Sequence, residues 1–135
     1  MKKHLLMLAL ASTCFMATQA GAMTKDEYKA GKEKIEADYK AAKAQCDALK
    51  DNAKDVCQKE AKGKENVAKA ELEQQYKPSD AHARKVAEEK VKDNYEVAKE
   101  KCDDQAGDAK AACVKQAKAD ESQGKADIKA MKKSM

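Results

Sequence analysis

The four cysteines beyond residue 22 are the side chains best suited to chemistry in this sequence. Ten residues separate Cys46 from Cys57, and ten separate Cys102 from Cys113 in a second copy 56 residues further on. Redox enzymes favour two intervening residues at a helix N-terminus, and structural zinc sites use two to four. The spacing matches neither pattern. It predicts disulfide bonds, with no metal ligand or cofactor-binding residue.

Other chemistry-bearing residues are sparse and form no recognisable catalytic set. His82 is the single histidine after residue 22, and we expect it to be a solvated helix residue with a weak capacity for a transition metal. No Ser/His/acid set, glycine-rich phosphate loop or paired-carboxylate motif stands out. Basic residues alternate with acidic ones, without the basic stripe and stacked aromatics of a nucleic-acid surface. We therefore predict a protein that is not an enzyme and takes no cofactor or small-molecule substrate.

The first 22 residues predict a secretory signal peptide. Lys2, Lys3 and His4 precede an apolar run over residues 5–17, and Ala20-Gly21-Ala22 forms a small-x-small cleavage site. The run is shorter than the ~20 residues needed to span a bilayer, so we expect no stable membrane anchor. Lipid modification of Cys14 is a minor alternative. The even number of cysteines after Ala22 suits an exported, oxidised protein, and we predict a periplasmic location.

Composition after residue 22 favours long helices around a thin core. Without Lys2 and Lys3, the 28 basic residues become 26 against 24 acidic ones, a net charge of +2. Only ten large aliphatic side chains are found in these 113 residues, with no Trp or Phe. Ala, Glu, Lys, Leu and Arg make up 62 of the 113, a share typical of long helices and coiled coils.

An internal repeat organises these helices. Residues 84–130 match residues 28–74 at 17 of 47 aligned positions, including both cysteines of each copy. Each copy has helix-breaking residues midway between its cysteines, Asp51-Asn52 in the first and Gly107-Asp108 in the second. Pro78-Ser79-Asp80 separates the copies. We predict an all-α fold of about four helices in two tandem hairpins, 23–77 and 78–135, extended or loosely bundled.

The disulfide connectivity has two solutions. In an unbroken helix Cys46 and Cys57 would lie about 16 Å apart, beyond the roughly 4.4–6.8 Å between the Cα atoms of a disulfide. A bend within each copy joins Cys46 to Cys57 and Cys102 to Cys113. Two long helices folded back at Pro78 would instead join Cys46 to Cys113 and Cys57 to Cys102. We favour the bonds within each copy, because both copies carry the break.

One helix face has the spacing of a coiled-coil seam. From Ile35 the small or apolar residues follow steps of four and three to Tyr39, Ala42, Cys46 and Leu49. Such a seam packs either within the chain or against a partner. Ile35 and Tyr39, with Val91 and Tyr95 in the second copy, are the residues we expect to face a protein partner or a second copy of the chain.

The predicted signal peptide, the Lys/Ala/Glu-rich helices and the stretch Cys-Asp-Ala-Leu-Lys-Asp-Asn-Ala-Lys-Asp-Val-Cys (46–57) together resemble small exported proteins of Gram-negative bacteria labelled TolA-like or cell-envelope-biogenesis proteins. A fainter resemblance is to phosphate-starvation-inducible repeat proteins. These resemblances imply a structural or protein-interaction role in the envelope, with stress as its setting. Two alternatives are a periplasmic holdase chaperone and a metal or redox-stress binder that uses the thiols and His82.

Overall fold

Four long α-helices follow one another in the computed structural model, which describes residues 22–133. They are α1 (Lys25–Cys46), α2 (Asp51–Tyr76), α3 (Asp80–Lys101) and α4 (Gly107–Lys133), and the short 3₁₀ helix η1 (Cys102–Asp104) follows α3. No strand occurs among the described residues. The predicted all-α fold is confirmed. The predicted signal peptide and its cleavage site lie almost wholly outside the described residues.

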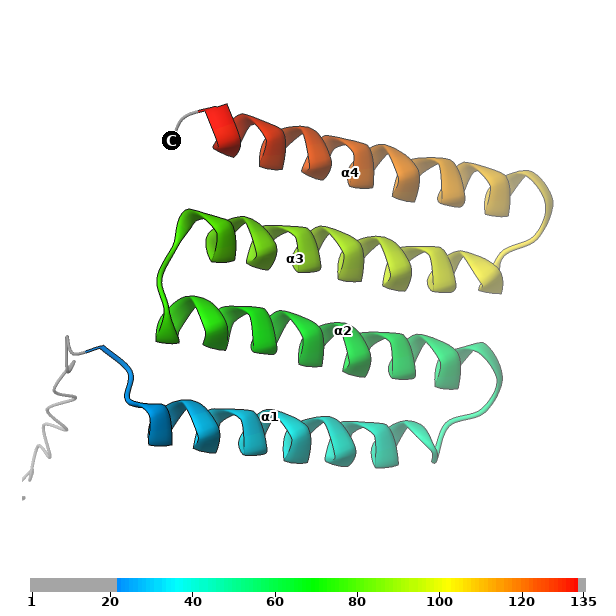
Figure 1. Cartoon of the computed structure of the whole chain (residues 1–135). Helices are drawn as coiled ribbons and strands as arrows, with labels where there is room; N and C mark the ends of the chain where they lie inside the picture. Colours follow the sequence, from blue (N-terminus) through cyan, green and yellow to red (C-terminus); the bar gives the residue numbers. More distant parts are fainter. Residues whose placement is uncertain (1–21, 134–135) are drawn as a thin grey trace, which may run out of the picture.

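The helices form a single row, each antiparallel to the next (Figure 1). Extensive contacts join α1 to α2, α2 to α3 and α3 to α4, so each long helix packs mainly on its neighbours in the sequence. Helical domains usually bury their apolar stripes between two packed layers. This row has one layer, and both of its broad faces are open to solvent.

Local chemistry explains where the helices start. Thr24 and Glu27 form a capping box at the start of α1, and Ser79 caps α3 by accepting a hydrogen bond from the backbone N–H of His82. The break predicted at Asp51-Asn52 is present, but the Asn52 side chain does not cap α2. The helix begins at Asp51, and the Asn52 side chain instead donates a hydrogen bond to the backbone oxygen of Glu100 in α3, at 3.1 Å.

Glycines let a large side chain of one helix sit close to the backbone of the next. Leu72 of α2 lies over Gly31 of α1, where an added Cβ would come within 2.7 Å of the leucine. In the second hairpin the roles are reversed, because Val91 of α3 lies over Gly124 of α4. Contacts of this kind allow close packing in a chain with few large side chains.

The buried core is small and consists of one cysteine of each disulfide and a few residues that lie mainly in α2. Cys46 and Cys102 are the two residues with the largest fully buried side chains among the described residues. The other buried residues lie almost entirely in α2, and α3 contributes none; they are Ala61, Gly63, Glu65, Ala70, Leu72 and, in α4, Ala117. The thin core predicted from composition is what the structure shows.

Candidate functional site: twin grooves on a disulfide-closed frame

Both disulfides lie within a hairpin. The Cα atoms of Cys46 and Cys57 are 5.4 Å apart, and those of Cys102 and Cys113 are 5.6 Å apart. Both distances fall in the range of a disulfide bond, which confirms the hairpins closed by disulfides. The rival pairing across the two copies is excluded, because each cysteine is already bonded inside its own hairpin. In this state no cysteine of the described chain offers a thiolate to a metal or an oxidant.

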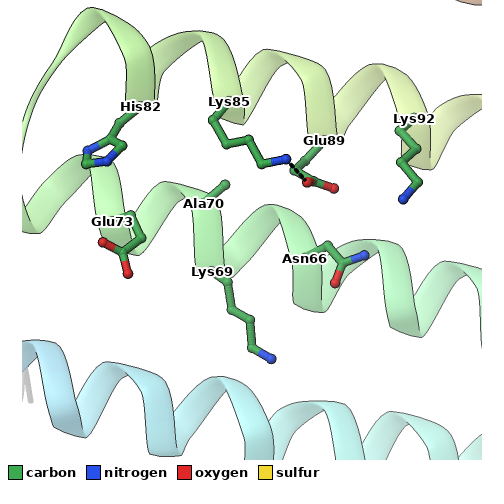
Figure 2. Close-up of a pocket in the computed structure, with 8 residues that line it drawn as sticks. All are labelled: Asn66, Lys69, Ala70, Glu73, His82, Lys85, Glu89 and Lys92. Atoms are coloured by element: carbon green, nitrogen blue, oxygen red, sulfur yellow. Dashed lines mark ion pairs between the residues drawn. The ribbon is translucent and has the colours of Figure 1, made fainter.

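His82 lies in a groove of about 440 Å³ between α2 and α3 (Figure 2). Its ring Nδ1 lies 2.6 Å from the backbone oxygen of Lys77, which favours the tautomer with the proton on Nδ1. Glu73 lies beside it and accepts a hydrogen bond from the Tyr28 hydroxyl, while Lys85 pairs with Glu89 at 2.7 Å. Charges of both signs alternate along this groove.

No group of three or more His, Cys, Asp or Glu side chains that could hold a metal occurs between residues 22 and 133. His82 therefore lacks the set of neighbouring ligands that a transition-metal site requires.

Two further grooves occupy equivalent places in the two hairpins. The first, of about 310 Å³, lies between α1 and α2, and the second, of about 540 Å³, lies between α3 and α4. Every residue that lines the first groove has its counterpart, 56 positions later, in the lining of the second. The matched positions are Ile35/Val91, Asp38/Asn94, Tyr39/Tyr95, Ala42/Ala98, Ala61/Ala117, Lys64/Asp120, Glu65/Glu121 and Ala68/Gly124.

These twin grooves contain the residues that the sequence analysis expected to face a partner. Ile35 and Tyr39 lie in the first groove, and Val91 and Tyr95 lie in the second. All four are half-buried, so each offers apolar surface without being sealed inside the fold. The small side chains around them keep the grooves open. Aromatic and aliphatic groups in a concave site with a few polar neighbours are what a binding site for a side chain needs.

Glu65, in the lining of the first groove, is the most deeply buried charged side chain among the described residues. Its two carboxylate oxygens accept hydrogen bonds from Lys62 at 2.8 Å and Lys69 at 2.6 Å. Burial raises the pKa of Glu65, but the two lysines outweigh burial and hold that pKa below its ordinary value. Glu65 is therefore an ionised, positioned group. Lys62 also lies 5.2 Å from the centre of the Tyr39 ring, in a cation–π contact.

Glu65 and its counterpart Glu121 were not predicted as groove residues from the sequence. The two copies have a glutamate at the same position, Glu65 in the first and Glu121 in the second. Each forms an ion pair with the lysine four residues later, Lys69 or Lys125. That shared pair was the signal in the sequence. It was hidden among many similar Glu/Lys pairs, which all look alike until the neighbouring helix shows which one is buried.

The chain matches no protein-family model, no curated protein sequence and no solved structure. Its resemblance to TolA-like envelope proteins therefore stays a prediction. Of the helices in the described part, none has the length and apolar character needed to cross a membrane.

Proposed function

We propose that this protein is a non-catalytic interaction protein of the cell envelope, exported to the periplasm, that binds a protein partner through its twin grooves. The observation that carries the proposal is the repetition of one groove, position by position, in two hairpins of an open row of helices. Two matched grooves suit a partner with two contact points, because linking two binding events raises the overall affinity well above that of either.

The predicted export supports this assignment. The amino-terminal sequence favours a signal peptide, and the two disulfides suit an oxidising compartment such as the periplasm. N-terminal sequencing of the protein isolated from a periplasmic fraction should begin at Met23. A chain that begins at Met1 in the cytoplasm would contradict the predicted export and leave the binding proposal to be tested separately.

The holdase chaperone and the metal or redox-stress binder are less well supported, the first by the exposed surface and the second by the state of the cysteines. A holdase chaperone needs apolar faces open to unfolded clients. Among the described residues, Leu49 is the single large hydrophobic residue that is exposed, at 42%. A metal or redox-stress binder would need free thiolates, and all four cysteines of the described chain are paired.

Site-specific photo-crosslinking in the periplasm tests the proposal. A photoreactive phenylalanine analogue replaces Tyr39 or Tyr95 in the grooves. As a matched control it replaces Lys59 or Lys115, which are exposed, also lie 56 positions apart and line neither groove. We expect one crosslinked species from both groove positions and none from the control positions. A species that contains only this chain would identify a second copy as the partner.

The partner identified in this way is then purified and its affinity measured. Tyr39→Ala combined with Tyr95→Ala should weaken binding at least about tenfold, because a buried tyrosine anchor contributes roughly 2 kcal/mol. Lys59→Ala combined with Lys115→Ala should leave the affinity unchanged. Equal crosslinking from groove and control positions, or equal affinity of both double variants, would refute the assignment.

A further inference from the structure

The boundary between the two hairpins contains a buried carboxylate oxygen that has no hydrogen-bond partner among the described residues. Asp93 of α3 lies against Gly63 of α2, at a point where any Cβ on residue 63 would overlap the carboxylate. The Oδ1 atom of Asp93 is buried and accepts no hydrogen bond from any described residue. A buried polar atom without a hydrogen bond costs free energy, and the cost is larger when the group is ionised.

This contact belongs to the boundary and has no equivalent in the other copy. The positions that correspond to Asp93 and Gly63 are Ala37 and Ala119, and both of these are exposed alanines. The acid and the glycine that makes room for it therefore occur together only where one hairpin meets the other.

The charged groups around Asp93 do not compensate its charge. Burial raises the pKa of Asp93, and repulsion from Glu96 on α3 and Glu60 on α2 raises it further, while Lys64 on α2 lowers it only in part. Glu60 itself pairs with Lys101 of α3 at 2.8 Å. The ionised form of Asp93 is thus disfavoured when α3 is packed on α2.

We propose that Asp93 makes the packing of the two hairpins depend on pH. Neutral Asp93 fits against Gly63 and allows α3 to pack closely on α2. Ionised Asp93 weakens this boundary, because its buried Oδ1 atom regains contact with water only when the helices separate. The twin grooves lie on opposite sides of the boundary, so a looser boundary changes the distance between them; this last consequence rests on the proposed function, and the packing effect does not.

The direction of the effect follows from the raised pKa. A carboxyl group with a raised pKa in the folded protein binds its proton more tightly there than in the unfolded chain. Its favourable contribution is complete below the ordinary pKa of aspartate and is lost as the pH rises through the raised value. The hairpins should therefore pack most tightly at acidic pH. Each unit by which the pKa is raised corresponds to about a tenfold change in the packing equilibrium.

The first test compares the wild-type protein with Asp93→Asn, which keeps the shape of the side chain and cannot ionise. Urea unfolding of the full exported chain is followed between pH 4 and 8. We expect the variant to gain stability relative to the wild type as the pH rises, with the difference levelling off at neutral pH. Taking the difference removes the effect of every other group that titrates. A difference that stays constant with pH overturns the proposal.

The second test places the effect at the boundary. A carbodiimide joins lysines to carboxylates that are in contact, so it reports the pairs Lys90–Glu71 and Lys101–Glu60 between the hairpins, with Lys85–Glu89 inside α3 as the reference. In the wild type, the ratio of inter-hairpin to reference product should fall as the pH rises, and in Asp93→Asn it should stay at its acidic value. Parallel profiles in both proteins would mean that Asp93 acts within α3 alone, and would overturn the proposal. Gly63→Ala should lower the ratio at every pH, because its Cβ displaces the carboxylate.

Discussion

The α1–α2 hairpin and the α3–α4 hairpin close in the same way at their disulfide ends. Each has a disulfide, and each has a lysine–aspartate ion pair beside it, Lys54–Asp47 at 3.3 Å and Lys110–Asp103 at 2.8 Å. The residue at the start of the second helix has a positive φ in both, 51° at Asp51 and 57° at Gly107. The disulfide, the ion pair and the residue with positive φ in the first hairpin each have a counterpart 56 positions later in the second.

The hairpins differ over the rest of their length. At the far end of the first, Tyr28 stacks on Tyr76 with 4.4 Å between ring centres and also bonds to Glu73. The equivalent positions in the second hairpin hold no aromatic residue; they are Arg84, Lys132 and Lys129. The aromatic contact at the far end of the first hairpin thus has no aromatic counterpart in the second. Where packing supplies less stability, the covalent bond supplies a larger share.

Removing a disulfide should have the largest effect on stability, and the loss should differ between the two hairpins. A bond that closes a loop of this length stabilises a fold by about 3 kcal/mol in the chain-entropy model. We expect Cys102→Ser with Cys113→Ser to remove more helicity than Cys46→Ser with Cys57→Ser, because the first hairpin keeps its Tyr28–Tyr76 stack and its buried Leu72. Circular dichroism of both double variants, with reduced wild type as reference, measures this. Equal losses would show that the far-end contacts of the first hairpin add little.

The second-largest effect on stability is expected from truncating Leu72 or its counterpart Ile128, the apolar side chain at the equivalent position of each hairpin. Leu72 is 8% exposed against Gly31, whereas its counterpart Ile128 is half-buried. Leu72→Ala should cost about 2–3 kcal/mol in unfolding free energy, and Ile128→Ala about 1 kcal/mol or less. Chemical denaturation of the two variants gives the comparison. A larger cost at Ile128 would mean that the second hairpin is the better packed of the two.

Exchanging the residues with positive φ tests the turns at a smaller scale. Gly107→Ala should destabilise the second hairpin by about 1–2 kcal/mol, because a side chain strains the left-handed conformation. No atom lies within 4 Å of the added Cβ, so the cost comes from the backbone alone. Asp51→Gly relieves the same strain in the first hairpin and should change its stability by only a few tenths of a kcal/mol, since Asp tolerates this conformation. Thermal unfolding measures both, and no loss in Gly107→Ala would argue against the strain.

The smallest difference in stability between the hairpins is expected for the glutamates that line the two grooves, Glu65 and Glu121. Glu65→Gln should cost about 1 kcal/mol at neutral pH, because Lys62 and Lys69 lose a buried charged partner. Because the pKa of Glu65 is lowered, this contribution is present above the ordinary pKa of glutamate and is lost as the pH falls through the lowered value. Glu121→Gln should cost less, since that side chain is 22% exposed. Urea unfolding at pH 7 and below pH ~4 tests the sign; a cost that grows in acid would contradict it.

Part of the candidate site was predictable from the sequence. Ile35, Tyr39, Val91 and Tyr95 were expected to face a partner because they recur at seam positions in both copies, and the structure places them in the two grooves. Ala42 was predicted on the same seam, but the small residues that the neighbouring helices contribute were not. Alanines and glycines occur throughout the chain, and only the approach of a second helix shows which of them line a groove.

Charged residues were the least predictable. In sequence context, Glu65 and Asp93 resemble many other acids on these helices. Both lie where two helices meet, but the pKa of Glu65 is lowered there and that of Asp93 is raised. Two lysines on its own helix stabilise the charge of Glu65. The Oδ1 atom of Asp93 is buried because Gly63, on another helix, leaves room for it. Burial of this kind depends on residues far apart in the chain, which no local pattern encodes.

The sequence by itself determined the helical class, the positions of the breaks and the two possible disulfide pairings. These features depend on local preferences: caps at Thr24 and Ser79, the proline at Pro78 and the glycine at Gly107 act over a few residues. Only the tertiary structure decided between the pairings, because both place the cysteines symmetrically about a bend. It also decided the single open row, the matched grooves and the unbonded carboxylate oxygen of Asp93 at the boundary between the hairpins, since each depends on which helix packs beside which.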